Sequence, residues 1–296
     1  MDYDIKEVDL FDPVAETKVT NLLRVTFNSD IHSQRVRLNT WTKSTVSPSL
    51  YLGAFIGEEL IGFNGFISHD LIWNGDIVNC HQSCWTATNP NHRGKRIFNN
   101  LIEEAKAILK ERGSAFILGF PNADSGAIFT SELGFTSSPM SKALIPSNWL
   151  LPTRNLRHWS DIETLVVENS YSQNEHQLIV LKKQESGGEI LVVEDYHNLI
   201  WGRMRKRKAG PLTLSYFDCG GMIINNPHFF GQLVAKLVGV YKPTYIQFVM
   251  HHTNQYAALF KQVRPAMHTE PLVLFDLKRQ TADARFNLFA GAKDIF

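Results

Sequence analysis

Residues 86–98 read Thr-Ala-Thr-Asn-Pro-Asn-His-Arg-Gly-Lys-Arg-Ile-Phe and separate two segments of different periodicity. The preceding residues 77–87 are typical of a strand, and the following residues place apolar side chains on one face of a helix. The turn therefore ends at a helix N-terminus, where free backbone N–H groups and a partial positive charge favour an anion. Because Arg93, Lys95 and Arg96 add positive charge, the stretch predicts a pyrophosphate site. A solvated basic turn is the alternative.

The residues upstream of this stretch predict a helix followed by antiparallel strands. Asp12 is suited to cap a helix that begins at Pro13, since proline fits the first helical position. Strands are expected over residues 50–56 and 60–73. Asn74-Gly75 then predicts a tight hairpin turn, because both residues tolerate a positive φ.

The residues downstream predict a long helix, a buried strand and a short helix. The helix has a natural end at Gly113, and residues 115–120 form the continuous apolar run of a central strand. A short helix is expected over 125–133, and a further strand opens at Gly134.

The second half of the chain repeats this order in weaker form after a polar linker at 146–160. We expect strands at 177–182 and 189–193, a hairpin around Gly220-Gly221, a helix from Pro227, a strand at 245–250, a helix at 254–263 and a last strand at 272–277. Similar order at similar spacing indicates a structural duplication. The predicted domains are residues 1–146 and 147–296.

Composition excludes several classes of protein. The 296 residues include 30 basic and 29 acidic ones, so the net charge of +1 gives no general reason to expect nucleic acid or an anionic membrane as partner. No apolar run approaches the ~20 residues of a membrane span. The acidic N-terminus is not a secretory signal. Three cysteines are too few for a disulfide framework, which favours a cytoplasmic protein with reduced thiols.

The order of elements over residues 50–135 resembles the GNAT superfamily of acyl-CoA N-acyltransferases. In that family a strand and a proline-containing turn lead to an Arg/Gln-x-x-Gly-x-Gly/Ala loop and a long helix. The sequence Glu-Leu-Gly-Phe at 132–135 matches a further family element. Residues 120–125 resemble the Phe-Pro-Asn-x-x-Ser signature of a two-lobed bacterial branch.

The resemblance implies an α/β fold with two GNAT-like lobes, each a mixed, mostly antiparallel sheet flanked by helices. The first lobe would bind acetyl-CoA, and the second, which lacks the loop motif, would shape the acceptor site. The implied acetyl-CoA contacts are the splayed strand end, the loop and the start of the short helix: Thr86, Ala87, Thr88, Arg93, Gly94, Lys95, Arg96, Ile97, Asn122 and Ser125. Backbone N–H groups of residues 86–88 would polarise the thioester carbonyl.

The sequence departs from the family pattern at three positions. Arg96 stands where the first motif glycine belongs, and Phe98 stands where the second belongs. Either the Arg96 side chain pairs with phosphate, or the cofactor site is weakened. Thr130 occupies the place of the tyrosine that commonly protonates the departing thiolate.

The candidates for acid–base chemistry are hydroxyl groups and histidines. Ser125 or Thr130 would supply a hydroxyl to the leaving thiolate, and His81 or His69 would accept a proton through water, since histidine titrates near neutral pH. No metal is expected, because adjacent histidines such as His251-His252 point to opposite faces of a strand.

Trp201, Arg203 and Arg205 are the candidates for binding the acceptor, within a basic run over 203–208. This aromatic and cationic pattern suits a nucleotide-linked amino sugar. The predicted function is acetyl-CoA-dependent N-acetylation of a small amine by direct transfer, without nucleic acid and with no prediction of oligomeric state. A non-catalytic GNAT-like binding protein and a tandem-GNAT aminoacyl transferase that uses charged tRNA are the alternatives.

Overall fold

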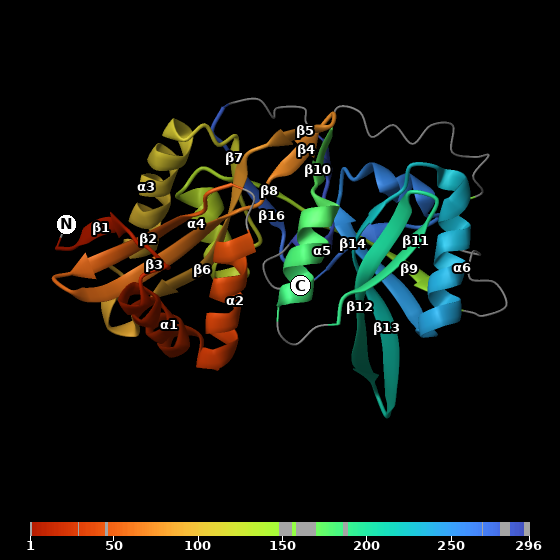
Figure 1. Cartoon of the computed structure of the whole chain (residues 1–296), viewed down its shortest axis with the longest axis horizontal. Helices are drawn as coiled ribbons and strands as arrows, with labels where there is room; N and C mark the ends of the chain where they lie inside the picture. Colours follow the sequence, from red (N-terminus) through yellow and green to blue (C-terminus); the bar gives the residue numbers. More distant parts are fainter. Residues whose placement is uncertain are drawn as a thin grey trace.

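The computed structural model describes residues 2–28, 30–44, 47–147, 156–157, 170–185, 189–267, 269–278 and 285–292. Most of the linker expected at 146–160, and Gly187 and Gly188, lie outside these residues. The described residues form two lobes that lie side by side, joined by a small sheet (Figure 1).

The first lobe is built on a seven-stranded sheet with helices on both faces. Its strands, in spatial order, are β1 (Asp4–Glu7), β2 (Leu50–Ile56), β3 (Glu59–Ser68), β6 (Cys80–Thr88), β7 (Phe116–Gly119), β16 (Leu272–Asp276) and β8 (Thr136–Ser138). Side chains alternate along β2: Leu50 and Leu52 face the core under helix α3 (Ile97–Glu111), and Tyr51 faces helix α1 (Pro13–Phe27).

Local signals explain where the main helices begin and end. The Asp12 carboxylate accepts hydrogen bonds from the backbone N–H groups of Val14 and Ala15, which confirms the expected cap of α1. Helix α3 buries Leu101, Ile102, Ala105 and Leu109 against the sheet, and Gly113 follows it with a φ of +78°. The remaining helices of this lobe are α2 (Ile31–Ser44), α4 (Ala123–Ser131) and the 3₁₀ turn η1 (Pro90–His92).

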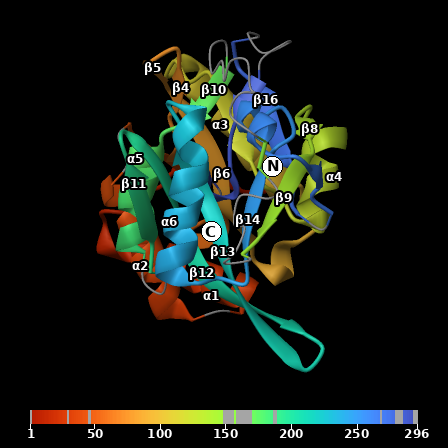
Figure 2. The ribbon, with the colours of Figure 1, turned by 90° about the vertical axis from the view of Figure 1, so that its right-hand side faces the viewer.

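The second lobe is a six-stranded sheet with helix α6 (Phe230–Tyr241) on its outer face (Figure 2). Its strands, in spatial order, are β11 (Leu191–Asp195), β12 (Asn198–Ala209), β13 (Leu212–Ile223), β14 (Tyr245–His251), β9 (Met140–Pro146) and β15 (Arg264–Pro265). The far end of the β12–β13 hairpin projects from the body of the molecule (Figures 1 and 2).

A small four-stranded sheet connects the lobes. Strands β4 (Leu71–Trp73) and β5 (Asp76–Val78) come from the first half of the chain, while β10 (Ser170–Gln173) and β17 (Arg285–Asn287) come from the second. Helix α5 (Glu175–Gln184) follows β10 and contacts α2. The remaining 3₁₀ turns are η3 (Pro227–Phe229), η4 (Gln255–Leu259) and η5 (Ala290–Ala292).

The structure confirms the predicted fold class. Each large sheet has one parallel contact, β6 with β7 and β13 with β14, and its other pairings are antiparallel. The lobes also exchange strands, because β9 pairs with β14 in the second lobe and β16 pairs with β7 and β8 in the first. A division of the chain at residue 146 therefore does not separate the sheets, and the domain boundary itself stays a prediction.

Three local predictions in the second half are wrong. The helix expected at 254–263 is only the 3₁₀ turn η4, which ends at Leu259. The expected strand at 177–182 is part of helix α5, which Asn174 caps through a hydrogen bond from Gln177 N. The hairpin does not turn at Gly220-Gly221 but at Gly210, which has a φ of +59°. Both glycines lie inside β13. These strand positions require glycine, because a Cβ at Gly220 would lie 2.3 Å from the Trp201 ring and a Cβ at Gly221 would lie 2.1 Å from Glu175 Oε2.

Candidate active site

The two parallel strands of the first lobe separate after only three paired positions. Pairing of β6 with β7 runs from Cys80–Phe116 to Gln82–Leu118, and β6 then continues to Thr88 paired only with β3 on its other side. The edge of β6 from Ser83 onward therefore faces an opening in the sheet rather than a neighbouring strand. Backbone polar groups at such an edge are available to a ligand.

A β-bulge bends β6 at this opening. Because Phe63 pairs with Ala87 and Gly65 pairs with Cys84, both Trp85 and Thr86 lie opposite the single residue Asn64. Trp85 has a φ of +53°, which is rare for a bulky side chain. Both residues of the bulge, Trp85 and Thr86, line the opening.

Asn64 clamps the bulge from the neighbouring strand. Its side chain is fully buried, its Oδ1 accepts a hydrogen bond from Thr86 Oγ1 at 2.8 Å, and its Nδ2 donates to Ser83 Oγ at 3.1 Å. The Asn64 amide thus links the side chain of the bulge residue Thr86 to that of Ser83, which precedes the bulge. Sequence reasoning missed this residue, because nothing in the local pattern identifies the partner of a bulge.

A cavity of about 820 Å³ occupies the opening. Residues 83–86 of β6 form one wall, and Phe120 to Ser125, between β7 and α4, form another. Three carboxylates and one guanidinium also line it: Asp30, Arg37, Asp124 and Glu270. The cavity can therefore hold an apolar group of a ligand against Phe98 and Phe129, while these charged side chains contact a cationic or polar group of the ligand.

The loop before α3 adjoins this cavity only through the helix that follows: Phe98, in the first turn of α3, lines the cavity, whereas none of the predicted loop contacts at residues 93–97 does. Gly94 has a φ of +78° and Arg96 a φ of +56°. Among the described residues, no acceptor bonds the backbone N–H groups of Ile97, Phe98 and Asn99. Free N–H groups at the start of a 15-residue helix, together with Arg93 and Lys95, suit a phosphate group.

Tyr3 braces the same loop from the N-terminal strand. Its hydroxyl group donates to the Lys95 carbonyl oxygen at 3.3 Å and accepts from Asn100 Nδ2 at 2.6 Å. The phenol thus ties the loop to the first turn of α3. Sequence reasoning missed Tyr3 because it lies more than 90 residues away along the chain.

The Arg96 backbone takes the left-handed conformation that favours glycine, at the position where the family motif has glycine. The chain therefore keeps the loop geometry without the residue that favours it. The guanidinium is exposed, with Nη2 3.4 Å from Glu132 Oε2, and the same oxygen accepts from Asn99 Nδ2 at 2.9 Å.

The structure brings together only part of the predicted acetyl-CoA contacts. Thr86, Asn122 and Ser125 all line the cavity. Asn122 caps α4, since its Oδ1 accepts from the N–H groups of Asp124 and Ser125 and from Ser125 Oγ at 2.9 Å. Ala87 and Thr88 lie outside the lining, further along β6, where they pair with β3.

Two predicted catalytic residues lie away from the cavity. His81 is buried at the paired end of β6, with Nδ1 3.0 Å from Ser114 Oγ and Nε2 3.0 Å from the Pro48 carbonyl oxygen. Burial lowers its pKa, and both ring nitrogens are engaged, so the structure opposes a role as base. Thr130 is exposed on α4, and its hydroxyl bonds backbone oxygens of its own helix. His69 is also buried outside the lining, and burial lowers its pKa to about 3.

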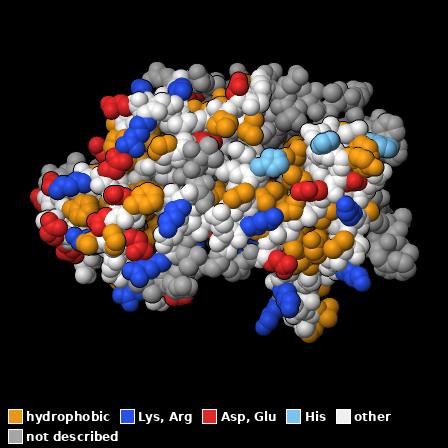
Figure 3. Space-filling view, in the orientation of Figure 1, with side chains coloured by type: hydrophobic (Ala, Val, Ile, Leu, Met, Phe, Trp, Pro, Cys, Tyr) orange, Lys and Arg blue, Asp and Glu red, His pale blue; other side chains and the backbone are white. Residues whose placement is uncertain are grey.

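The prediction that Trp201 presents a surface to the acceptor is wrong. Trp201 is fully buried, and its indole N–H donates to Glu175 Oε2. Arg203 and Arg205 follow on β12, where Arg205 Nε lies 2.8 Å from Asp218 Oδ2. Further along this hairpin, Lys and Arg side chains gather on its projecting end (Figure 3).

The corresponding gap in the second lobe is filled by the chain itself. Pairing of β13 with β14 ends at Cys219–Phe248, and beyond it Phe289 bridges to Met250. A Cβ at Gly291 would lie 2.2 Å from the Gly220 carbonyl oxygen, so the segment is in close contact with β13. Residues 288–292 thus occupy the place where the first lobe is open.

Two further features of the described part of the chain bear on chemistry and location. It contains no cluster of three His, Cys, Asp or Glu side chains arranged to hold a metal ion. None of its helices combines the length and apolar character needed to cross a membrane.

Comparison with known proteins agrees with this geometry. Residues 12–137 match the family described as acetyltransferase (GNAT) domain. No curated protein matches the chain by sequence.

Solved structures share the fold across nearly the whole chain. A GCN5-related N-acetyltransferase from Anabaena variabilis aligns with a TM-score of 0.67 at 10% identity, covering 93% of this chain and 73% of that one. Eis1 from Mycobacterium abscessus aligns with a TM-score of 0.58 at 14% identity, covering 93% and 73%. A GCN5-related N-acetyltransferase from Kribbella flavida aligns with a TM-score of 0.56 at 13% identity, covering 92% and 71%. At these identities the similarity concerns the fold alone.

Proposed function

We propose that this protein is an acetyl-CoA-dependent N-acetyltransferase that acetylates a small amine by direct transfer. The observation that carries the proposal is the opened β6–β7 pair, with its bulge and adjoining loop, inside residues 12–137 that match the GNAT domain family. The proposed cytoplasmic location follows from composition alone.

The loop at residues 93–97 is the proposed site of the acetyl-CoA pyrophosphate. Free N–H groups at the start of α3 and the charges of Arg93 and Lys95 complement an anion. The positive φ angles of Gly94 and Arg96 set the loop backbone, and Tyr3 holds it against the helix. These contacts would fix the co-substrate while its thioester lies in the opening.

The bulge at Trp85 and Thr86 is the proposed site of carbonyl polarisation. N–H donors aimed at a carbonyl stabilise the negative charge that develops on its oxygen during acyl transfer. The amine lone pair attacks the carbonyl carbon, so a C–N bond forms and the C–S bond breaks. The departing thiolate takes up a proton, for which Ser125 Oγ is the candidate donor within the cavity.

The acceptor amine must lose its proton before it attacks. With His81 and His69 outside the cavity, the carboxylates of Asp30, Asp124 and Glu270 are the candidates to attract an ammonium group and to accept its proton through water. Asp30 lies directly before α2 and Glu270 lies in the segment before β16, so elements outside the central motif complete the site.

The second lobe, built mainly from the proposed domain 147–296, is the proposed determinant of the acceptor. The filled β13–β14 gap leaves it without the opening that serves acetyl-CoA in the first lobe. Arg203 and Arg205 would then meet an anionic part of the acceptor, as a nucleotide-linked amino sugar would present.

The test is incubation of the protein with acetyl-CoA and a panel of amines that includes nucleotide-linked amino sugars, followed by mass spectrometry. An acceptor heavier by one acetyl group, together with free CoA, supports the proposal. Stabilisation by acetyl-CoA without turnover of any amine would favour the non-catalytic alternative. Failure of acetyl-CoA to bind would refute both.

A further inference from the structure

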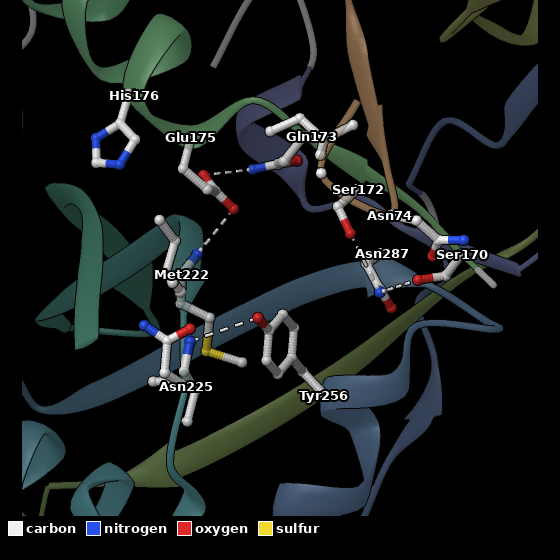
Figure 4. Close-up of a pocket in the computed structure, with 14 residues that line it drawn as sticks. Asn74, Ser170, Ser172, Gln173, Glu175, His176, Met222, Asn225, Tyr256 and Asn287 are labelled. Atoms are coloured by element: carbon white, nitrogen blue, oxygen red, sulfur yellow. Dashed lines mark hydrogen bonds between the residues drawn. The ribbon is translucent and has the colours of Figure 1, made fainter. Parts of the chain in front are cut away.

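A second cavity, of about 760 Å³, lies where the small connecting sheet meets the second lobe (Figure 4). Ser172 and Gln173 of β10, Glu175 and His176 of α5, and Met222 of β13 contribute to its walls. The β4–β5 turn closes one side of it with Asn74 and Gly75. Its lining residues differ entirely from those of the cavity at the β6–β7 opening.

One carboxylate dominates the chemistry of this cavity. Glu175 is only 5% exposed, and the described lining contains no Lys or Arg and no second carboxylate. Hydroxyl and amide groups from Ser170, Ser172, Asn225 and other residues also line the cavity. Apart from His176, the other polar side chains of the lining are neutral, so the cavity offers one potential negative charge, which opposes phosphate and other anionic ligands.

The surroundings of Glu175 are built to hold this carboxylate. Oε2 accepts from Gln173 Nε2 at 2.8 Å and from the Trp201 indole, and Oε1 accepts from Met222 N at 3.1 Å. A Cβ at Gly221 would lie 2.1 Å from Oε2, so glycine at this position leaves the space that the carboxylate fills.

These three partners are neutral N–H donors and do not balance a charge. A buried carboxylate is costly unless a cation accompanies it, and burial raises the pKa of Glu175 to about 8. The ammonium group of a ligand would supply this cation and so favour the ionised form of Glu175, to which its N–H groups donate charge-assisted hydrogen bonds.

We propose that this cavity is a second ligand site, which binds a small hydroxylated molecule carrying a protonated amine. The Glu175 carboxylate pairs with the ammonium group, and the hydroxyl and amide groups of Ser172, Asn225 and Tyr256 bond the ligand hydroxyls. Because the site uses elements of both halves of the chain, a bound ligand would also link the β4–β5 turn to the second lobe. The proposal does not depend on the acetyltransferase activity.

The probe for this site is glucosamine, with glucose as its neutral counterpart and glucosamine 6-phosphate as its anionic one. Isothermal titration calorimetry of the full chain without acetyl-CoA should show glucosamine binding at least tenfold more tightly than either counterpart, as expected for loss of a charged contact. Equal binding of glucose and glucosamine would overturn the proposal. This comparison uses the unaltered protein, so it does not depend on the folding of any variant.

Two variants locate the bound probe. Glu175→Gln should weaken glucosamine binding at least tenfold, while Asp30→Asn, at the other cavity, should leave it unchanged. The reverse pattern would place glucosamine at the proposed acceptor site and refute the second site. If Glu175→Gln does not fold, Tyr256→Phe replaces it and should weaken glucosamine binding about threefold or more. If Tyr256→Phe has no effect and Asp30→Asn weakens glucosamine binding instead, the second site is likewise refuted.

Discussion

The Arg96 guanidinium lies 3.4 Å from the Glu132 carboxylate, while the Arg96 backbone holds a left-handed conformation directly before α3. The side chain thus connects the start of α3 to the end of α4, and the backbone shapes the proposed pyrophosphate loop. These are separate contributions, because one depends on charge and the other on conformation. Two substitutions at this position separate them.

Arg96→Ala and Arg96→Gly remove the same charge but differ in how readily the new residue adopts the left-handed backbone conformation. A left-handed alanine costs about 1 kcal/mol, whereas glycine adopts this conformation freely, so Arg96→Gly should be the more stable variant by about that amount. We expect both variants to bind acetyl-CoA about tenfold more weakly, through loss of a charged contact. Denaturant unfolding and calorimetry check these expectations. Tighter binding by Arg96→Gly would show that the side chain obstructs the site, as the non-catalytic alternative requires.

Gly94 and Gly113 make a matched pair for testing the loop. Both have a φ of +78° and neither would place a Cβ within 4 Å of another group. Gly94→Val and Gly113→Val should therefore destabilise the protein to a similar extent. Only Gly94→Val should abolish stabilisation by acetyl-CoA, as measured by thermal shift. If both variants bind equally well, the pyrophosphate site lies elsewhere.

The sequence predicted much of the first lobe because many of its signals are local, but the single strand expected at 60–73 is wrong, since β3 and β4 lie in different sheets. The Asp12 cap, the Asn74-Gly75 turn and the apolar face of α3 each depend on neighbours within a few residues. Helix α2 was missed within a polar stretch. Its signal was present in Gln34, Leu38 and Trp41, which are all buried and follow helical spacing.

The second lobe was predicted less well because distant contacts decide it. Gly220-Gly221 has the composition of a turn, yet the Trp201 ring and the Glu175 carboxylate, 19 to 46 residues away, require glycine inside a strand. The exchange of β9 and β16 between the lobes has no signal in the local sequence of either strand. His81 and Trp201 were chosen by residue type, and type does not reveal that tertiary contacts bury both.

Tyr3→Phe tests whether the N-terminal strand supports the co-substrate site. The substitution removes the hydroxyl group that bonds Lys95 O and Asn100 Nδ2 while keeping the ring in place. We expect the KM for acetyl-CoA to rise about threefold to tenfold, with a smaller change in kcat, because the loop loses its brace. An equal fall in kcat at unchanged KM would contradict this positioning role.

Glu175 should make stability depend on pH. Burial raises its pKa from 4.5 to about 8, so the folded protein holds a proton that the unfolded chain releases. This contribution to stability is complete below about pH 4.5 and is lost as the pH rises toward 8. Buried His69 and His251, whose pKa values burial lowers to about 3, act in the opposite direction below about pH 6.5.

The test therefore compares the Tm of the wild type with that of two variants between pH 6.5 and 9, a range in which these histidines do not contribute. The wild-type Tm should fall by roughly 5 °C or more over this range, and that of Glu175→Gln should fall less. Glu104→Gln, on the exposed side of α3, serves as control and should follow the wild type. Parallel curves for all three proteins would show that Glu175 does not titrate in this range.

Arg203 and Arg205 test the proposed role of the second lobe in choosing the acceptor. Arg205 already pairs with Asp218, which keeps its guanidinium in a fixed orientation on β12. We expect Arg203→Gln/Arg205→Gln to raise the KM for an anionic acceptor about tenfold and to leave acetyl-CoA affinity unchanged, since the loop at residues 93–97 lies in the other lobe. Lys206→Gln/Lys208→Gln, further along the same strand and on its opposite face, serves as the control for a general loss of charge. An equal effect of both double variants would indicate general electrostatic attraction, and loss of acetyl-CoA binding in the arginine variant would place the pyrophosphate at the second lobe.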